Sequence, residues 1–360
     1  MIAGGAVGYV GAQVGLQAAK HWPPSVSIAL VLLLVPSFFL VIALHEAGHA
    51  WMGLRVHFDF RFYVVGPFMW EKENGRWRFK WNTNVNLSGG MVLCLPTDSH
   101  NLSKRFAWYA AGGPLASVLT AALFLIFYIL LNTFPSTAPF WQLITLWMWL
   151  LFFLSMVIFV LTAIPFHTNG FSSDGARVLR LSRGGDTAAV EVMLLKVIAS
   201  SCSGVRPSHL KRSEMEASLA LAEKMNAPMG LYFHYYLFYH AFDSQALEFA
   251  EEHLTYYLNK GDNIPAGLRA GIFLDAAFFY AVGKKDLEKA MHYFTQFKPS
   301  ALIAKATILA VEASLAILKN EKDDAERLID KAFEEMPKAL DRGITLFMKE
   351  KLVTMKEGTF

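Results

Sequence analysis

His45, Glu46 and His49 belong to an HEAGH pentad, the stretch of this chain best suited to metal chemistry. On a helix, residues four apart share a face, so His45 and His49 can bind one Zn²⁺ ion. Glu46 stands next to them and can act as a base on a water that the metal holds. The pentad therefore predicts a catalytic zinc site.

The setting of the pentad is an apolar run long enough to span a membrane. Residues 25–44 carry no charged side chain before His45. Histidine and glutamate at membrane depth are costly unless they are paired or bound to a metal. An apolar helix has no structural need of them, so we favour a functional interpretation.

Two further uncharged runs, residues 108–131 and 143–165, exceed the roughly 20 residues that a transmembrane helix requires. Residues 1–19 are uncharged and glycine-rich, with GxxxG spacing. We interpret them as a retained helix rather than a signal peptide, because no basic region precedes the apolar stretch. A composition of 54% hydrophobic and 18% charged residues agrees with about four transmembrane helices, with spans near 1–19, 25–54, 108–131 and 143–165.

Loop charges predict the topology. Basic residues are frequent between residues 55 and 105 and again after residue 176, whereas residues 132–142 are uncharged. The positive-inside rule then places the long loop and the C-terminal half in the cytoplasm, most simply at the plasma membrane. The pentad would lie near the cytoplasmic end of its helix.

The loop at about residues 56–90 has the alternation of β-strands. Asn74-Gly75 is a typical hairpin turn, which predicts a membrane-associated β-hairpin over residues 71–81. An edge strand beside the metal could hold an unwound substrate by strand addition. An interfacial hairpin anchored by its Trp and Arg side chains is the alternative, and the two are compatible.

From about residue 183 the chain becomes charged and amphipathic, which predicts a soluble α-helical domain over residues 183–360. Residues 280–290 align with 315–325, an offset of about 35 residues that approaches the 34 of a tetratricopeptide unit. A tetratricopeptide-like domain and a generic helical bundle fit equally well, and either offers a groove for a cytoplasmic protein partner.

We expect four histidines of this domain to be surface or packed residues: His234, His240, His253 and His292. Cys94 and Cys202 form neither a disulfide framework nor a CxxC metal pair.

A catalytic zinc site needs a third protein ligand, and Asp174 is the candidate. It follows the last span and could approach the pentad at the same depth. The alternative is that Asp174-Gly175 forms only a turn or a helix N-cap. The spacing leaves both interpretations open.

Together these features resemble the site-2 protease family of intramembrane zinc metalloproteases. The resemblance rests on HEAGH in one span, Ala111-Gly112-Gly113-Pro114 in the next and Ser173-Asp174-Gly175 after the last, and covers roughly residues 25–185. It implies His45, His49 and Asp174 as zinc ligands and Glu46 as general base. Gly66-Pro67 is similar to a Gly-Pro pair in the family's β-structure, which suggests a contact with substrate.

The sequence departs from the family pattern at three places. Thr162 stands where the family has the Asn of NxxP, and Ser117 replaces the Asn after the Gly-Pro pair. The interval from Pro165 to Asp174 is also longer than usual. Asn169 in this interval is a candidate substrate-binding substitute, although a polar loop residue is the simpler interpretation. His167 is a weaker candidate still, as a ligand or a support for one.

We therefore expect an all-α polytopic membrane protein with a membrane-associated β-hairpin and a helical C-terminal domain. Residues 1–182 would form an intramembrane metalloprotease domain with one Zn²⁺ ion, and its substrates would be transmembrane proteins. The alternative is an inactive membrane scaffold that recruits partners through residues 183–360. A transporter is disfavoured because the spans show no repeat, and the balanced charge gives no support for nucleic-acid binding. The sequence does not determine the oligomeric state.

Overall fold

The computed structural model describes residues 22–73, 75–82, 89–98, 100–168, 171–260, 266–299, 303–339 and 341–358. The predicted span at residues 1–19 lies outside them, so the expectation of a fourth span stays a prediction.

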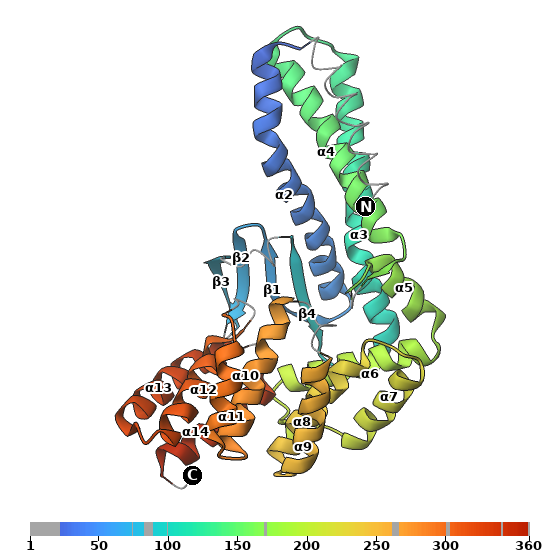
Figure 1. Ribbon diagram of the computed structural model, residues 1–360. Helices are drawn as coiled ribbons and strands as arrows, with labels where there is room; N and C mark the ends of the chain where they lie inside the picture. The colour runs from blue at the N-terminus through green and yellow to red at the C-terminus, as the bar shows by residue number, and fades with distance from the viewer. Residues whose placement is uncertain are drawn as a thin grey trace.

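Three long helices form a stem that rises above the rest of the molecule (Figure 1). They are α2 (Pro24–Arg55), α3 (Leu102–Thr133) and α4 (Pro139–Ala163). Within the described residues, these three are long and apolar enough to cross a membrane. Their bounds agree with the predicted spans to within six residues. The largest difference is at the start of α3, where the helix begins in the charged segment before the apolar run.

Glycines bring α2 and α3 into backbone contact. A Cβ atom added to Gly48 would lie 2.3 Å from the carbonyl oxygen of Gly112, and one added to Gly112 would lie 2.5 Å from that of Gly48. Such closeness is typical of helices packed through small residues in membranes. Farther along the stem, Trp147 of α4 donates a 2.8 Å hydrogen bond to Ser37 of α2.

The β-structure is larger than the predicted hairpin. A four-stranded antiparallel sheet has the order β3-β2-β1-β4. Its strands are β1 (Phe58–Val65), β2 (Phe68–Glu73), β3 (Arg76–Trp81) and β4 (Met91–Pro96). Strands β2 and β3 form the predicted hairpin, in which Glu73 pairs with Arg76. The prediction missed β4, a short apolar run that pairs with β1 from the far side of the loop.

The sheet lies against the lower half of α2 (Figure 1) and shares a core with three helices. The helices that contribute to this core are α3, α5 (Asp174–Arg183) and α6 (Gly185–Cys202). The buried side chains in it include Phe58, Phe60, Val92, Cys94, Phe106, Tyr109, Leu181 and Ala188. The sheet, the stem and the first helices of the C-terminal half are therefore packed together around the lower end of α2.

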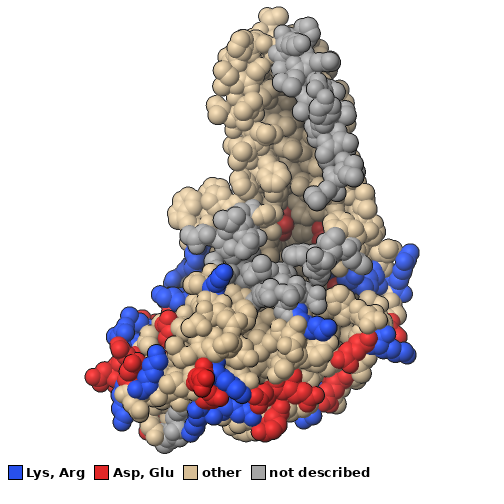
Figure 2. Space-filling view, viewed as in Figure 1, with Lys and Arg blue, Asp and Glu red and all other residues tan. Residues whose placement is uncertain are grey.

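A layer of helices forms the base of the molecule (Figure 1). This helical layer consists of α6 and the helices that follow it: α7 (Arg212–Lys224), α8 (Gly230–Asp243), α9 (Leu247–Asn259), α10 (Ala266–Val282), α11 (Leu287–Gln296), α12 (Lys305–Leu318), α13 (Lys322–Glu335) and α14 (Arg342–Lys356). Short elements connect the parts: β5 (His167–Thr168), β6 (Phe171–Ser172), η2 (Pro207–His209) and η4 (Met336–Lys338). Acidic and basic side chains gather over this layer, whereas the stem is nearly free of them (Figure 2).

Three helix pairs within the layer share one design. In α8–α9, α10–α11 and α12–α13, the connecting turn contains a residue with positive φ: Gln245, Lys285 and Asn320. Five residues later each second helix has a fully buried alanine, namely Ala250, Ala290 and Ala325. The small side chain lets the paired helices approach closely. The sequence similarity between residues 280–290 and 315–325 thus corresponds to two of these pairs, and their assignment to the tetratricopeptide class stays a prediction.

Candidate metal centre

His45 and His49 lie one turn apart on α2, on the face that packs against α3. Only 5% of His45 and 8% of His49 are exposed. Their Nε2 atoms are 3.2 Å apart. The four-residue spacing on a helix therefore brings both rings to the same point, as the sequence predicted.

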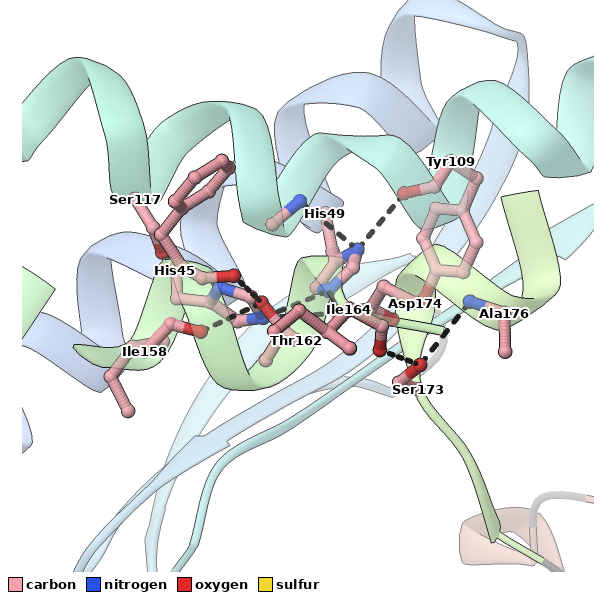
Figure 3. Close-up of polar contacts among 12 residues, drawn as sticks. His45, His49, Tyr109, Ser117, Ile158, Thr162, Ile164, Ser173, Asp174 and Ala176 are labelled. Carbon is pink, nitrogen blue, oxygen red and sulfur yellow. Dashed lines mark hydrogen bonds and ion pairs between the residues drawn. The ribbon is translucent and has the colours of Figure 1, made fainter. Parts of the chain in front are cut away.

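Asp174 is the first residue of α5, and Ser173 is the N-cap. The Ser173 hydroxyl accepts hydrogen bonds from the backbone N–H groups of Ala176 at 3.2 Å and Phe166 at 3.1 Å, and donates one to Ile164 O at 2.8 Å. Ser173 thus ties the start of α5 to the end of α4. Ser173, and not Asp174, therefore caps the helix. The Asp174 carboxylate faces the two histidines instead (Figure 3).

The three side chains form a nearly equilateral triangle of ligand atoms. The Oδ2 atom of Asp174 lies 3.4 Å from His45 Nε2 and 3.3 Å from His49 Nε2. Together with the 3.2 Å between the two nitrogens, these separations match a tetrahedral zinc site, in which bonds of about 2.0 to 2.1 Å place ligand atoms about 3.3 to 3.4 Å apart. Among the described residues, this is the group of histidine, cysteine, aspartate and glutamate side chains that could hold a metal ion.

Helix α3 orients both imidazole rings through their Nδ1 atoms. His45 Nδ1 lies 2.8 Å from Ser117 Oγ, and His49 Nδ1 lies 2.9 Å from the backbone oxygen of Tyr109. The Gly113 N–H is also 3.3 Å from His49 Nδ1. A carbonyl can only accept, so the shorter contact places the proton of His49 on Nδ1 and leaves Nε2 available as a ligand.

Gly113 makes room for the two rings. A Cβ atom added here would lie 2.3 Å from His49 Nε2 and 2.5 Å from His45 Nε2. No larger residue fits without displacing the nitrogens that face Asp174. The Gly-Pro motif on α3 therefore has a local steric purpose.

Glu46 is close to the triangle but is not one of its three members. Its half-buried carboxylate interacts electrostatically with the two histidines and Asp174 and with the backbone of Val92. A Cβ atom added to Gly90 would lie 3.0 Å from Glu46 Oε1. The carboxylate thus lies between the triangle and the start of β4, where a proton acceptor could reach a water without binding the metal.

The surroundings of Asp174 favour its ionised form. Burial opposes ionisation, but a proton on the facing Nε2 atom of His45 or His49 outweighs it and holds the pKa of Asp174 below its usual range. An ionised carboxylate is the form that binds zinc. Figure 2 shows acidic atoms in a hollow at the base of the uncharged stem.

The remaining predicted site residues lie elsewhere or are not described. Gly66 and Pro67 form the turn between β1 and β2, where a Cβ atom on Gly66 would lie 2.9 Å from Phe39. Asn169 is outside the described residues, and the side chain of His167 is too. Thr162 donates its hydroxyl to Ile158 O of its own helix at 2.9 Å. Gly66 and Pro67 therefore stay predicted substrate contacts without a place in the triangle.

Two of the four histidines in the helical layer form a buried pair. The Nδ1 atoms of His234 and His253 are 2.8 Å apart, and burial lowers the pKa of each ring to about 4. Both rings are therefore neutral near pH 7. His292 is exposed and contacts Gln296. This agrees with the expectation of packed or surface histidines.

The supports of the histidine rings were not predicted from the sequence. Ser117 stood out there only as a departure from the family pattern, and Tyr109 was not among the candidate residues. A signal was present, because Tyr109, Gly113 and Ser117 are four residues apart and share one face of α3. That spacing mirrors the spacing of His45 and His49 on α2.

Comparison with known families agrees with this geometry. The model of peptidase family M50 matches residues 33–327, and the chain belongs to that family. The match extends far beyond residue 185, where we expected the resemblance to end, and includes most of the helical layer. No match was found among curated proteins or among solved structures. The family is one of membrane proteases, in agreement with the three apolar helices.

Proposed function

We propose that this protein is a zinc-dependent intramembrane endopeptidase that hydrolyses peptide bonds in or near the transmembrane segments of other proteins. One observation carries the proposal: His45, His49 and Asp174 form a triangle whose edges of 3.2 to 3.4 Å suit three ligands of one tetrahedral Zn²⁺. Three protein ligands leave the fourth position open, which is typical of a catalytic rather than a structural site.

The residues divide the chemistry among them. His45, His49 and Asp174 would hold the metal, which polarises the scissile carbonyl and acidifies a water when bound. Glu46 takes the proton of that water and later delivers it to the leaving amide nitrogen. Ser117 and the Tyr109 carbonyl keep the two rings oriented during this cycle.

The edge strand β4 supplies a place for an extended substrate. We expected the hairpin at residues 71–81 to provide this edge, but β3 lies at the opposite side of the sheet. Strand β4 is the other edge, and the Glu46 carboxylate lies beside Gly90 at its start. A substrate that adds to β4 as a strand would present its peptide bonds next to the general base, as hydrolysis of an unwound helix requires.

The charge distribution supports a cytoplasmic location for the sheet and the helical layer. Basic residues flank the lower ends of the spans, and the charged side chains gather on the base of the molecule (Figure 2). The metal centre would then face the cytoplasmic side of the plasma membrane. The helical layer is a candidate surface for a cytoplasmic protein partner.

An inactive scaffold is the less favoured function. A scaffold has no need of Glu46 beside three converging metal ligands, nor of glycines that make room for them. If the scaffold alternative held, Glu46→Gln would leave function intact.

Zinc content and cleavage of a single-span membrane protein, measured together on purified protein, test the proposal. We expect Glu46→Gln to retain about one zinc per chain and to lose cleavage by a factor of about 10³ or more. Asp174→Ala should lose cleavage and most of its bound zinc, because only two ligands remain. Asp186→Ala is the matched control, because Asp186 is an exposed aspartate in the first turn of the next helix. Full zinc and full cleavage in Asp174→Ala would overturn the assigned third ligand.

A further inference from the structure

Glu191 is a buried carboxylate for which the proposed chemistry has no use. It lies on α6, and only 5% of it is exposed. Its Oε1 atom is 3.1 Å from Arg177 Nε and its Oε2 atom is 2.6 Å from Arg180 Nε. A charge this deeply buried is stable only when it is paired, and Glu191 has two partners on one neighbouring helix.

Both partners are on α5, the helix that begins with the candidate ligand Asp174. Arg177 and Arg180 follow Asp174 at intervals of three residues, so all three side chains are one helical turn apart in succession. Helix α5 spans only 10 residues. A contact that fixes the body of so short a helix also fixes the backbone of Asp174, from which the carboxylate reaches the histidines.

Further contacts of α5 join it to α3. Ser103 Oγ donates a 2.9 Å hydrogen bond to Leu181 O, and the guanidinium of Arg177 lies 5.4 Å from the centre of the Phe106 ring. Leu181 is buried in the core with Ala188 of α6. The body of α5 is thus held between the stem on one side and Glu191 on the other.

Helix α6 is in turn part of the helical layer. Its Lys196 pairs with Glu214 of α7 at 3.0 Å, and its Ser201 donates a 2.6 Å hydrogen bond to Asp341 at the start of α14. A displacement of the layer would therefore reach α5 through Glu191 and its two arginines.

We propose that Glu191 is a positioning residue for the metal centre: through Arg177 and Arg180 it holds α5 so that Asp174 completes the ligand triangle. The inference rests on the proposed zinc site. It makes the metal affinity of the stem depend on the helical layer, which gives a partner bound to that layer a route to control the protease.

Zinc affinity of the purified full-length protein, measured by competition with a chelator, tests the proposal. Glu191→Gln preserves the shape of the side chain and removes its charge. We expect it to weaken zinc binding by about tenfold or more, in the range of other groups that act behind a metal ligand. Glu191→Asp keeps the charge and should recover part of the affinity.

Asp243→Asn is the matched control. Asp243 is also a buried carboxylate paired with an arginine, Arg206 at 2.6 Å, but both partners lie within the helical layer. The zinc affinity of this variant should equal that of the wild type. An equal loss in Asp243→Asn and Glu191→Gln would mean general destabilisation and would overturn the inference.

A double-mutant comparison shows whether Glu191 acts through Asp174. In an Asp174→Ala background, Glu191→Gln should cause no further loss of the residual zinc affinity, because the residue that it positions is gone. An additive loss contradicts the inference. Should Glu191→Gln not fold, Arg180→Lys carries the same expectation, since it keeps the charge and alters the geometry.

The two proposals fail in different ways. A wild-type protein that binds no zinc contradicts the proposed function itself. A wild-type protein that binds zinc, with Glu191→Gln at equal affinity, contradicts only the positioning role.

Discussion

The Nδ1 atom of His45 lies 2.8 Å from the hydroxyl oxygen of Ser117, so each metal-facing histidine on α2 has its own support on α3. One turn away, His49 Nδ1 contacts the Tyr109 carbonyl at 2.9 Å. The helices run antiparallel: His45 meets Ser117, and His49 meets the Tyr109 carbonyl and the Gly113 N–H, which is four residues from Ser117. The register of the two helices therefore sets the orientation of both rings.

Ser117→Ala should weaken zinc binding by about ten- to hundredfold, because His45 loses the group that orients its ring. Chelator competition measures the change. Ser155→Ala is the matched control: Ser155 is a fully buried serine on α4 whose hydroxyl has no hydrogen-bond partner within the described part of the chain. Equal zinc affinity in the two variants would contradict the role of Ser117.

Gly113→Ala should abolish zinc binding while the helices remain formed. The added methyl group would lie 2.3 Å from His49 Nε2 and 2.5 Å from His45 Nε2, so both rings must turn away from Asp174. Bound zinc and helical content by circular dichroism measure the two effects. Gly89→Ala serves as control, because its Cβ would meet nothing within 4 Å among the described residues. A Gly113→Ala protein with full zinc would show that the rings can bind the metal in another orientation.

Gly175→Ala should reduce both zinc content and cleavage. A Cβ atom at this position would lie 1.8 Å from the Ala163 carbonyl oxygen, so the start of α5 must move away from the end of α4 and carry Asp174 with it. Gly230→Ala is a fitting control, since Gly230 also begins a helix and its added Cβ makes contacts of 3.4 Å or more. We expect that control to retain zinc, and wild-type behaviour of Gly175→Ala would refute the coupling between α4 and the metal centre.

Asp275→Asn should make the helical layer less sensitive to pH. Burial raises the pKa of Asp275 to about 7, although Tyr239 donates a 2.5 Å hydrogen bond to it. The folded protein thus keeps a proton that the unfolded chain releases above its ordinary pKa of 3.8. The stability that this group contributes is complete below about pH 4 and is lost as the pH rises through about 7, on the order of a few kcal/mol.

The asparagine removes this loss and still accepts the hydrogen bond from Tyr239. Thermal unfolding in detergent at about pH 5 and about pH 8 measures the effect. The wild type should be less stable at the higher pH, and the variant should show a smaller difference. The same pH dependence in both proteins would mean that Asp275 is ionised in the folded state.

Much of the stem was predictable because its signals are local. The absence of charge over some 20 residues defines a span, and the pentad places two candidate ligands on one helical face. The proposed role of Asp174 needed the family resemblance, since a Ser-Asp-Gly turn alone also describes a capped helix start. In the structure Ser173 caps the helix and the Asp174 carboxylate faces the two histidines.

Contacts between distant segments could not be predicted in this way. Strand β4 pairs with β1 and not with β3, its neighbour in sequence. No hairpin turn in the sequence therefore predicts this pairing. Ser117 faces His45 across 72 residues of sequence. In the sequence Glu191 is indistinguishable from other acidic residues of an amphipathic helix. Only the packing of α6 against α5 pairs it with Arg177 and Arg180. Each of these depends on the helix and strand registers that the whole fold sets.

The closeness of Gly48 to Gly112 also restricts how a substrate can enter. Backbones in direct contact, with ring-to-helix hydrogen bonds on either side, make α2 and α3 a single rigid wall of the active site. Parting that wall would break the metal centre itself. Helix α4 is tied through Ser173 to the start of α5 and thus to Asp174. Admission of a membrane segment therefore falls to the edge of the sheet, which carries none of the three candidate ligands.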